Sequence, residues 1–446
     1  MLDAVFSRAI GIDVHQNLLV CNARIYQDGH WINDMQTFGA YQVDLDAMTA
    51  WCQQYSPETI LMESTGVYWK SVFKSLERAN LNPSVVNARQ VRGMVGKKTD
   101  MNDAQWLSKI ATLGTFTPSY IPDEKWRDLR STSRGLSKLI ASRQAYKNRE
   151  NKVFVEAGYR LHSVFSDTFG RSAQIAKDGI LAGKSAEEIV KDLNSKRLKA
   201  SKEELINALQ GELHEEHRIL IEAYREVIKT LDDKIDSLTN YLISEVQKLE
   251  NRNFMLLQTI PGFDKLSAAV FLIEVGGRNF LDAFANEERF ASWLGVCPGN
   301  NESAGKRKSG RSRKGNIYLR RILCEAAQAA ARTKGTTFQS KYNSLSIRLG
   351  RKRSIFAIAH KLTRVAYKIL AKQEPYIERH VDYQKLSTKK NAPRWLKNLM
   401  RYNEEWDVVA RNRKTGEVLS TDKIQAAEQA KKAAAKGEFR SLVNSK

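Results

Sequence analysis

Short apolar runs and helical patterns alternate over the first 120 residues, which predicts a sheet with helices packed on it. Five apolar runs are short enough for strands: 5–14, 18–26, 31–38, 59–63 and 84–88. Asp28-Gly29, between the second and third runs, is typical of a hairpin turn. Three stretches have the apolar spacing of helices: 43–55, 67–79 and 101–113. Hairpin strands followed by alternating helices and strands indicate a mixed α/β sheet.

The strand signal disappears after residue 123, and we expect helices up to about residue 250. Capping-box sequences that begin at Ser185 and Ser201 mark two helix starts. Between 212 and 249 apolar residues recur at steps close to a coiled-coil seam: Leu220, Ala223, Ile228, Leu231, Ile235, Leu238, Leu242 and Val246. This seam predicts pairing with a second chain or, alternatively, a helical hairpin within the same chain.

The remaining chain divides into a helical segment and a basic tail. Residues 251–375 have helical patterns interrupted by Gly and Pro, and Asn391-Ala392-Pro393 in the tail is expected to be a linker. A solvated Ala- and Lys-rich helix is expected at 426–436. The predicted domains are an α/β domain at 1–120, a helical coiled-coil region at 121–250, an all-α domain at 251–375 and a basic extension at 376–446.

The charge of the chain points to a nucleic-acid partner. Lys and Arg number 72 against 50 Asp and Glu, which gives a net charge of +22. Such an excess favours a polyanion, because neutralising phosphates releases condensed counterions. The four scattered cysteines contain no CxxC pair and indicate neither a zinc site nor a disulfide framework. No signal peptide or long apolar run is evident, so we expect a cytoplasmic, nucleoid-associated protein of a bacterium or archaeon without membrane contact.

Four carboxylates stand at positions where strands end or a helix begins. Asp13 ends the first predicted strand, Glu63 ends a later one, and Asp100 and Asp103 share one face at a helix start. Mg²⁺ prefers such oxygen ligands, and two ions held together can clamp both oxygens of a phosphoryl transfer. Turn and cap roles are the alternative for each acid alone.

The phrases around these acids resemble a known family. Ile10–Val14, Met62–Tyr68 and Lys97–Ala104 look like the N-terminal domain of DEDD-type insertion-sequence transposases, which has a ribonuclease H-like, RuvC-like fold. The resemblance implies that Asp13, Glu63, Asp100 and Asp103 form the quartet that binds Mg²⁺. It also implies that a nearby nucleic-acid groove is lined by Asn87, Arg89, Arg92, Lys97 and Lys98.

A second candidate site begins at the turn Pro261-Gly262. The helix expected at 266–275 would present backbone N–H groups to a DNA phosphate, although a plain loop between core helices is the alternative. The basic loop Asn301–Gly315 follows. Such a loop cannot bury itself, so we expect it to be solvated unless a polyanion orders it. The predicted contacts here are Lys306, Arg307, Lys308, Arg311, Arg313 and Lys314, extended by Arg320 and Arg321 on a helix expected at 317–332 with Asn316 as its N-cap.

A serine in this loop can attack a phosphodiester once a base or metal activates it. Composition alone does not choose among Ser303, Ser309 and Ser312, and it also permits a loop that only binds phosphate. Trp293–Pro298, Glu302-Ser303-Ala304-Gly305 and Gly315-Asn316 resemble the C-terminal domain of the same family. That resemblance implies that Ser303 is the nucleophile and forms a covalent phosphoserine link to DNA.

Further cations fit the family pattern on a helix expected at 356–370, namely Lys361, Arg364 and Lys368, with a solvated basic face as the alternative. The family also implies a structured non-coding guide RNA that pairs with donor and target DNA. It further implies a homo-oligomer, a dimer or tetramer, whose active site combines the acids of one subunit with the serine of another. The sequence thus predicts a transposase that cuts and rejoins DNA. A metal-dependent junction nuclease and a non-enzymatic nucleic-acid-binding regulator are the alternatives.

Three weaker candidate sites remain. His214 and His217 stand among acids and are expected to be solvated surface residues. His15 is close enough to Asp13 for a local structural role or a contact with the metal site. Tyr318 and Tyr367 lack the surroundings expected of a tyrosine nucleophile.

Overall fold

The structure is a computed structural model of the 446-residue chain. It describes residues 4–64, 66–87, 100–193, 198–299, 301–303, 306–310, 312, 314–402, 409–411 and 415–420. Contacts divide the chain into two units, the first ending at Asp128 and the second beginning at Leu129. The finer division into four domains stays a prediction. No helix in the described part of the chain is long and apolar enough to cross a membrane.

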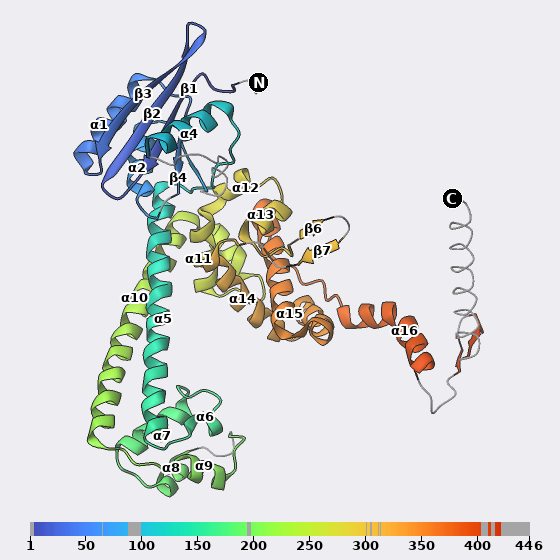
Figure 1. Ribbon diagram of the computed structural model, residues 1–446. Helices are drawn as coiled ribbons and strands as arrows, with labels where there is room; N and C mark the ends of the chain where they lie inside the picture. Colours follow the sequence, from blue (N-terminus) through green and yellow to red (C-terminus); the bar gives the residue numbers. More distant parts are fainter. Residues whose placement is uncertain are drawn as a thin grey trace, which may run out of the picture. The chain divides into compact units, whose positions relative to one another are not determined.

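The first unit is built on a five-stranded mixed sheet in the order β3-β2-β1-β4-β5 (Figure 1). Its strands are β1 (Arg8–Val14), β2 (Leu18–Gln27), β3 (His30–Gly39), β4 (Thr59–Glu63) and β5 (Pro83–Val86). β1, β2 and β3 form an antiparallel meander, whereas β4 runs parallel to both β1 and β5. This order and these directions are those of a ribonuclease H-like, RuvC-like fold, as predicted.

Helices cover both faces of this sheet. They are α1 (Gln42–Gln54), α2 (Trp69–Arg78) and α4 (Asp100–Leu113). One face packs with α1 and α2 through a large apolar core that includes Ile10, Ile12 and Met48. The opposite face packs with α4 through Ala9, Leu61 and Leu107. All eight elements predicted for residues 5–113 are therefore confirmed, with ends shifted by a few residues.

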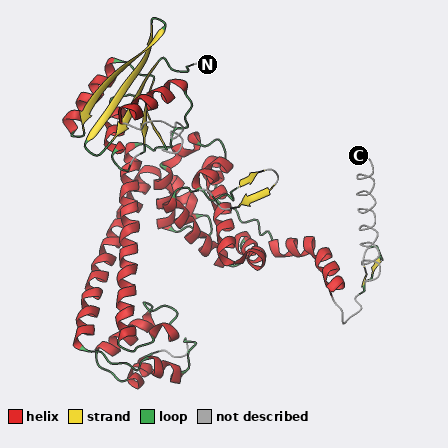
Figure 2. Cartoon of the chain, in the orientation of Figure 1, coloured by secondary structure: helices red, strands yellow, loops and turns green. Residues whose placement is uncertain are grey.

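The second unit is largely helical (Figure 2). It begins within α5 (Glu124–Glu156) and continues through α6 (Leu161–Val164), α7 (Arg171–Leu181), α8 (Ala186–Asp192), α9 (Lys202–Ala208) and α10 (Glu215–Gln258). It then contains α11 (Lys265–Val275), η2 (Gly277–Asn279), α12 (Phe280–Ala283), α13 (Glu287–Leu294), β6 (Asn301–Ser303), β7 (Lys306–Ser309), α14 (Ile317–Arg332), α15 (Thr337–Lys372), α16 (Tyr383–Tyr402), β8 (Ala410–Arg411) and β9 (Val418–Leu419). Both predicted capping boxes, at Ser185 and Ser201, are confirmed.

The helices α5 and α10 pair as an antiparallel hairpin within one chain. Arg143 bonds Asp232 at 2.6 Å and Arg225 bonds Glu150 at 3.2 Å, so the numbering of the partners runs in opposite directions. The buried residues of α10 repeat every seven positions, at Ile221, Ile228, Ile235 and Leu242. A seven-residue repeat is the spacing of a coiled-coil seam. The hairpin alternative is therefore confirmed for this seam.

Two sequence predictions for this unit are wrong in detail. Leu220 is 42% exposed, because the seam at the start of α10 runs through Ile221 one residue later. Asn391-Ala392-Pro393 is not a linker, since α16 continues through it. A proline ends most helices because it lacks an N–H, yet α16 extends on both sides of this proline. The helix expected at 426–436 lies outside the described residues.

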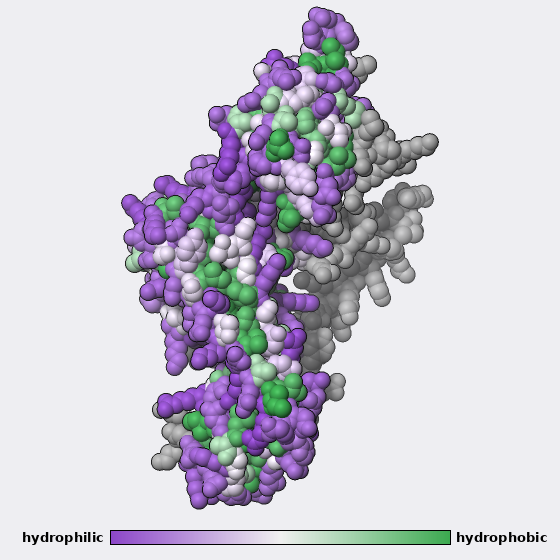
Figure 3. Space-filling model, turned by 90° about the vertical axis from the view of Figure 1, so that its left-hand side faces the viewer, coloured by the Kyte–Doolittle hydropathy of each residue, from purple (hydrophilic) through white to green (hydrophobic). Residues whose placement is uncertain are grey.

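Hydrophilic residues cover most of the face in Figure 3, with smaller hydrophobic groups between them.

Candidate functional site

Asp13 and Glu63 lie next to each other at the same end of two parallel strands. Ile12 of β1 stands opposite Met62 of β4 in the strand register. The following residues, Asp13 and Glu63, are therefore neighbours at the carboxyl ends of these strands. Adjacent strands are about 4.8 Å apart, so the two acids occupy matching positions on neighbouring strands. The sequence predicted this convergence from strand ends alone.

The alternation of side chains places both acids on the sheet face that α4 covers. Ile12 and Met62 belong to the core on the face of α1 and α2, whereas Leu61 packs on the α4 side. Successive side chains in a strand point to opposite faces. Asp13 and Glu63, each one residue beyond those core residues, thus face the same side as α4.

The part of α4 just after its first turn passes directly over β1. A Cβ at Gly11 would lie 2.3 Å from both the Ala104 carbonyl oxygen and the Ser108 amide nitrogen. Only glycine permits so close an approach of two backbones. Asp103 is next to Ala104, and Asp100 is the first residue of α4. The packing at Gly11 therefore brings both positions to the face of Asp13, which lies two residues beyond Gly11 in β1. Tight packing at Gly11 thus fixes the position of α4 against β1.

The described acids of the quartet differ in their surroundings. Asp13 is 9% exposed, and its Oδ2 is 3.0 Å from His15 Nε2. Asp103 is half-buried, and Asp100 is described as a position in the helix without its side chain. No group of three or more His, Cys, Asp or Glu residues close enough to hold a metal occurs among the side chains that the structure describes. Strand register and helix placement therefore bring these positions to one face of the sheet, and the metal site stays a prediction.

A buried amide, which was not predicted from the sequence, fixes α4 on the sheet. Asn22 is fully buried on β2 opposite Gly11, and its Nδ2 donates to Ser108 Oγ at 2.6 Å. Most buried polar groups in proteins are hydrogen-bonded, and this bond joins β2 to α4. The signal in the sequence was an asparagine inside the apolar run of 18–26.

Residues around the candidate serine form a short hairpin instead of the expected open loop. β6 and β7 are antiparallel, and Ser303 stands opposite Lys306 in their register. The segment interpreted as a loop therefore contains strands at 301–303 and 306–309. Cross-strand backbone bonds satisfy polar groups without burying side chains, which is how a basic segment can still form strands. The predicted contacts Arg311 and Arg313 lie outside the described residues.

The end of this basic segment is fastened to the helical core. A Cβ at Gly315 would lie 2.1 Å from the Leu294 carbonyl oxygen, so the backbone packs tightly there. Asn316 then caps α14 as predicted, because its Oδ1 accepts from the backbone N–H groups of Tyr318 and Leu319, both at 3.1 Å. The segment after Ser303 thus ends at a fixed point.

A buried glutamate holds this cap in place. Glu274 on α11 is fully buried, and Arg134 of α5 donates to both of its oxygens at 2.9 Å. Asn316 Nδ2 donates to Glu274 Oε2 at 2.6 Å, and Arg130 donates to the Glu274 backbone oxygen at 2.6 Å. The Arg134 guanidinium also lies 4.7 Å from the Tyr318 ring. This network was not predicted from the sequence, although an acid within the apolar helix 265–275 was its signal.

Comparisons with known proteins agree with both halves of this architecture. Residues 10–157 match a family model described as a DEDD transposase, and residues 255–343 match one described as the transposase IS116/IS110/IS902 family. Together these matches span more than half of the chain. The chain belongs to this transposase family. It is therefore an enzyme of DNA phosphoryl transfer, and the non-enzymatic alternative is excluded.

Relatives of the transposase are similar over different lengths. A protein of Pseudomonas aeruginosa described as a family 20 transposase is 23% identical over 73% of this chain and 87% of the relative. A protein of Sinorhizobium fredii described as a transposase is 32% identical over 34% of this chain and 38% of the relative. A Thermus thermophilus RuvC structure has 12% sequence identity, a TM-score of 0.21, and covers 25% of this chain and 99% of that one.

Several predicted nucleic-acid contacts of the transposase have partners inside the protein. Arg364 bonds Glu288 at 2.6 Å, and Lys368 bonds Glu287 at 2.7 Å. Lys368 and Arg364 hold the pKa of Glu287 down to about 2, because both donate to its carboxylate. Lys361 donates to the Tyr383 hydroxyl at 3.0 Å. These pairs favour a structural role for this face of α15, and nucleic-acid contact at the three cations stays a prediction.

The other predicted contacts differ in how much the structure says about them. Arg321 pairs with Glu325 one turn along α14, and Lys314 is exposed. Lys306, Arg307 and Lys308 are described only as positions in β7, and Arg320 stacks over Phe356. The contacts Arg89, Arg92, Lys97 and Lys98 lie outside the described residues.

The turn at Gly262 is explained by packing. Its φ is +94°, and a Cβ there would lie 2.2 Å from the Ala326 carbonyl oxygen of α14. The first turn of α11 is capped by Asp264, whose Oδ1 accepts from the Ser267 amide at 2.7 Å. A carboxylate already occupies the place where an anion would bind. The packing alternative therefore accounts for Gly262, and a DNA contact stays a prediction.

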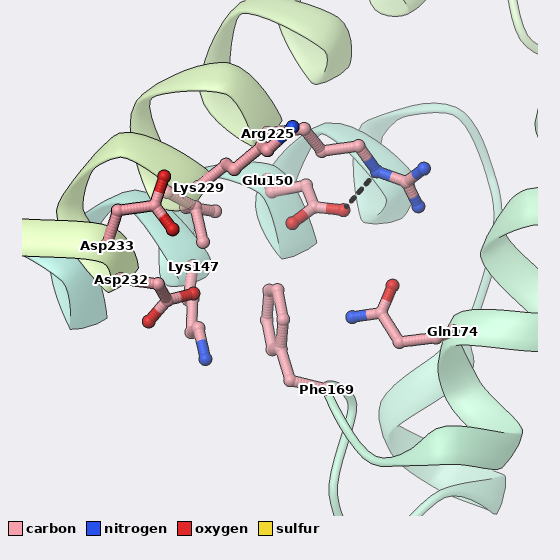
Figure 4. A pocket seen from close by; sticks show the side chains of 9 residues that line it. Lys147, Glu150, Phe169, Gln174, Arg225, Lys229, Asp232 and Asp233 are labelled. Carbon is pink, nitrogen blue, oxygen red and sulfur yellow. Dashed lines mark hydrogen bonds and ion pairs between the residues drawn. The ribbon is translucent and has the colours of Figure 1, made fainter. Parts of the chain in front are cut away.

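A pocket of about 380 Å³ lies between α5 and α10, near the connection to α7 (Figure 4). Its charged residues largely neutralise one another, since Arg225 pairs with Glu150 and Asp178, and Asp232 pairs with Arg143.

Tyr367 is no nucleophile in this structure, because its buried hydroxyl donates to the Phe284 carbonyl at 2.6 Å. These groups stabilise the fold of the transposase.

Proposed function

We propose that the transposase holds Mg²⁺ on the quartet Asp13, Glu63, Asp100 and Asp103. The observation that carries this proposal is the register of β1 and β4, which makes Asp13 and Glu63 neighbours on the face under α4. The donor set fits the ion, because Mg²⁺ prefers carboxylate oxygens. Bound Mg²⁺ would supply positive charge that stabilises a phosphodiester undergoing substitution and lowers the pKa of a coordinated hydroxyl.

We further propose that Ser303 is the nucleophile of the reaction. Its Oγ forms a bond to phosphorus while the bond from phosphorus to one sugar oxygen breaks. The serine proton leaves to a base, and the departing sugar oxygen gains a proton. The result is a phosphoserine link and a free DNA end, and attack by another DNA hydroxyl reverses the step and rejoins the strand. Cations of the hairpin, above all Lys306 opposite Ser303, stabilise the charge on phosphorus.

A labelled-DNA gel tests both proposals together. We expect a protease-sensitive covalent band with wild-type protein that disappears with EDTA and with Ser303→Ala. Ser309→Ala and Ser312→Ala are matched controls, because both serines stand in the same basic segment and should keep the band. Free cleaved ends without a covalent band select the junction nuclease, in which water attacks and Ser303 only contacts phosphate.

Metal binding is tested separately by titrating Mg²⁺ into the purified protein. Glu63→Gln removes a ligand at a strand end and is expected to weaken binding at least tenfold. Glu58→Gln is the matched control, because Glu58 bonds Ser7 and Arg8 beyond the opposite end of β4. Equal affinity in the two variants would contradict the metal site.

A guide RNA and a homo-oligomer, a dimer or tetramer, are further parts of the proposal. The net charge of +22 fits RNA as well as DNA, since both are polyanions. Purified transposase is expected to carry a discrete RNA whose loops match the ends of its element. Light scattering before and after ribonuclease treatment measures the oligomer. Protein that purifies as an RNA-free monomer and still rejoins DNA would contradict both parts.

A further inference from the structure

A long stretch of the second unit contains cations without any acid. Between Glu325 and Glu374 the sequence has no Asp or Glu, yet it has eleven Lys and Arg residues. The charges of an ordinary surface alternate in sign, so a stretch of this length is unusual for a solvated face. The stretch covers the end of α14 and all of α15.

Seven of these cations fall into two groups in the structure. Arg364 and Lys368 pair with acids of α13, and Lys361 bonds Tyr383. A second group gathers where α15 bends, and we name it the bend cluster: Arg348, Arg351, Lys352 and Arg353. All four side chains of the bend cluster are exposed, and none forms an ion pair with a residue that the structure describes.

The backbone conformation of Gly350 and a buried hydrogen bond fix the bend in α15. Gly350 has φ +71° and ψ 170°, a conformation that is essentially restricted to glycine. Ser354 is fully buried one turn later, and its Oγ donates to the Gly350 carbonyl at 2.8 Å. The break thus divides α15 into two halves and holds Arg348 on one side with three cations on the other. These positions are set by the backbone and by a buried contact.

The bend cluster does not stabilise its own helix. Arg351, Lys352 and Arg353 open the second half of α15, where the helix dipole is positive and acids are the favourable residues. Four neighbouring cations also repel one another. Both effects disappear when an anion is bound. Three of the four are arginines, whose planar fork bonds two phosphate oxygens at once.

We propose that the bend cluster binds the sugar–phosphate backbone of a nucleic-acid strand. Its exposed, unpaired arginines match repeated phosphates, and the protein already acts on DNA as a transposase. The contact reads charge and spacing, not base sequence, because phosphate contacts carry no sequence information. This site needs neither Ser303 nor the carboxylates, so it stands or falls separately from the proposed chemistry.

Salt dependence of binding tests the proposal, because its slope counts the phosphates that a protein neutralises. The test variant carries Arg351→Gln, Lys352→Gln and Arg353→Gln. The matched control carries Lys191→Gln, Lys199→Gln and Lys202→Gln, which removes the same charge from exposed lysines of the α8–α9 region. Fluorescence anisotropy with a labelled DNA duplex and with a labelled single-stranded RNA gives Kd across a series of salt concentrations.

We expect the slope of log Kd against log salt to fall in the test variant. The decrease should be about 0.9 on duplex DNA, and about 0.7 on a single strand, for each phosphate that the variant no longer neutralises. The control should keep the wild-type slope. A change with duplex alone assigns the site to DNA, a change with RNA alone assigns it to RNA, and a change with both makes it a general backbone site. Equal slopes in the test variant and the control, with both probes, would overturn the proposal.

Two further variants separate charge from folding. Arg351→Lys with Arg353→Lys keeps the charge and should keep the slope, while losing some affinity because lysine cannot bond phosphate bidentately. Arg348→Gln changes the other side of the bend and should lower the slope by about 0.9 on duplex DNA, the value for one phosphate. If the triple variant does not fold, these two decide the question, and a wild-type slope for Arg348→Gln overturns the proposal.

Discussion

Asn316→Asp is the sharpest test of the network that holds the end of the serine segment. Asparagine and aspartate are about equally good N-caps, so the change is nearly neutral at an ordinary helix start. Asn316 also donates through Nδ2 to the buried carboxylate of Glu274 at 2.6 Å. A carboxylate cannot donate, so the substitution turns a hydrogen bond into the contact of two negative charges.

The magnitude follows from two terms. A hydrogen bond to a charged group contributes about 1.5–3 kcal/mol. Two like charges about 4 Å apart repel by roughly 4 kcal/mol at an effective dielectric constant of about 20. Arg134, which bonds both oxygens of Glu274, remains and offsets part of the repulsion. We therefore expect the free energy of unfolding to fall by about 2–4 kcal/mol at neutral pH, where the new carboxyl is charged.

The loss should depend on pH in a defined direction. Repulsion raises the pKa of the new carboxyl in the folded state above its unfolded value of about 3.9. The protonated form can donate to Glu274 again, so the destabilisation appears as pH rises through the unfolded pKa and is complete above the folded one. Stability relative to the wild type is thus better at pH 5 than at pH 8.

Urea denaturation followed by circular dichroism at both pH values measures these changes. The matched control is Asn286→Asp, since Asn286 is the exposed N-cap of α13 and its Oδ1 accepts from the Arg289 amide at 2.9 Å. The control should change stability by less than about 0.5 kcal/mol. If the two variants lose equal stability, or if the loss does not shrink at low pH, the reasoning about Glu274 is refuted.

Three further predictions concern other parts of the transposase. Gly11→Ala should lower the free energy of unfolding by about 3 kcal/mol or more in a urea titration, because its Cβ collides with the Ala104 carbonyl. It should also weaken Mg²⁺ binding. Gly135 has open space around it, so Gly135→Ala should instead stabilise α5 by up to about 1 kcal/mol in the same titration. Burial lowers the pKa of Lys177 to about 8 in the folded protein. Below pH 8 the charged Lys177 therefore lowers the free energy of unfolding. This destabilisation is lost as pH rises from about 8 to the unfolded pKa of about 10.4. Lys177→Met should therefore be more stable than wild type at pH 7 by at most about 3 kcal/mol, and this difference should vanish near pH 11, whereas a difference that is constant with pH would contradict it. Arg134→Met should destabilise by about 3–5 kcal/mol, measured by thermal denaturation, because it leaves buried Glu274 without its bidentate partner; no loss would contradict the role given to that pair.

Local pattern determined most of the secondary structure. The strands, the hairpin turn at Asp28-Gly29, the capping boxes and the helix 317–332 follow from residue periodicity and cap chemistry, which act over a few neighbouring residues. The positions of Asp13 and Glu63 at strand ends were likewise evident. Their family role came from resemblance to known phrases, since spacing alone left cap and turn alternatives open.

Only the tertiary structure decided which residues meet. The sequence did not reveal that α4 packs on β1 at Gly11. The α4 residues that contact Gly11 are about ninety residues away from it along the chain. It did not reveal that Glu274, Arg134 and Asn316 form one network, because burial of an acid depends on distant partners. It likewise left the partner of the α10 seam open, since an apolar stripe is the same for an intramolecular and an intermolecular helix pair. Periodicity specifies which face of an element is buried, but the partner of that face is a long-range contact, and only the folded chain supplies it.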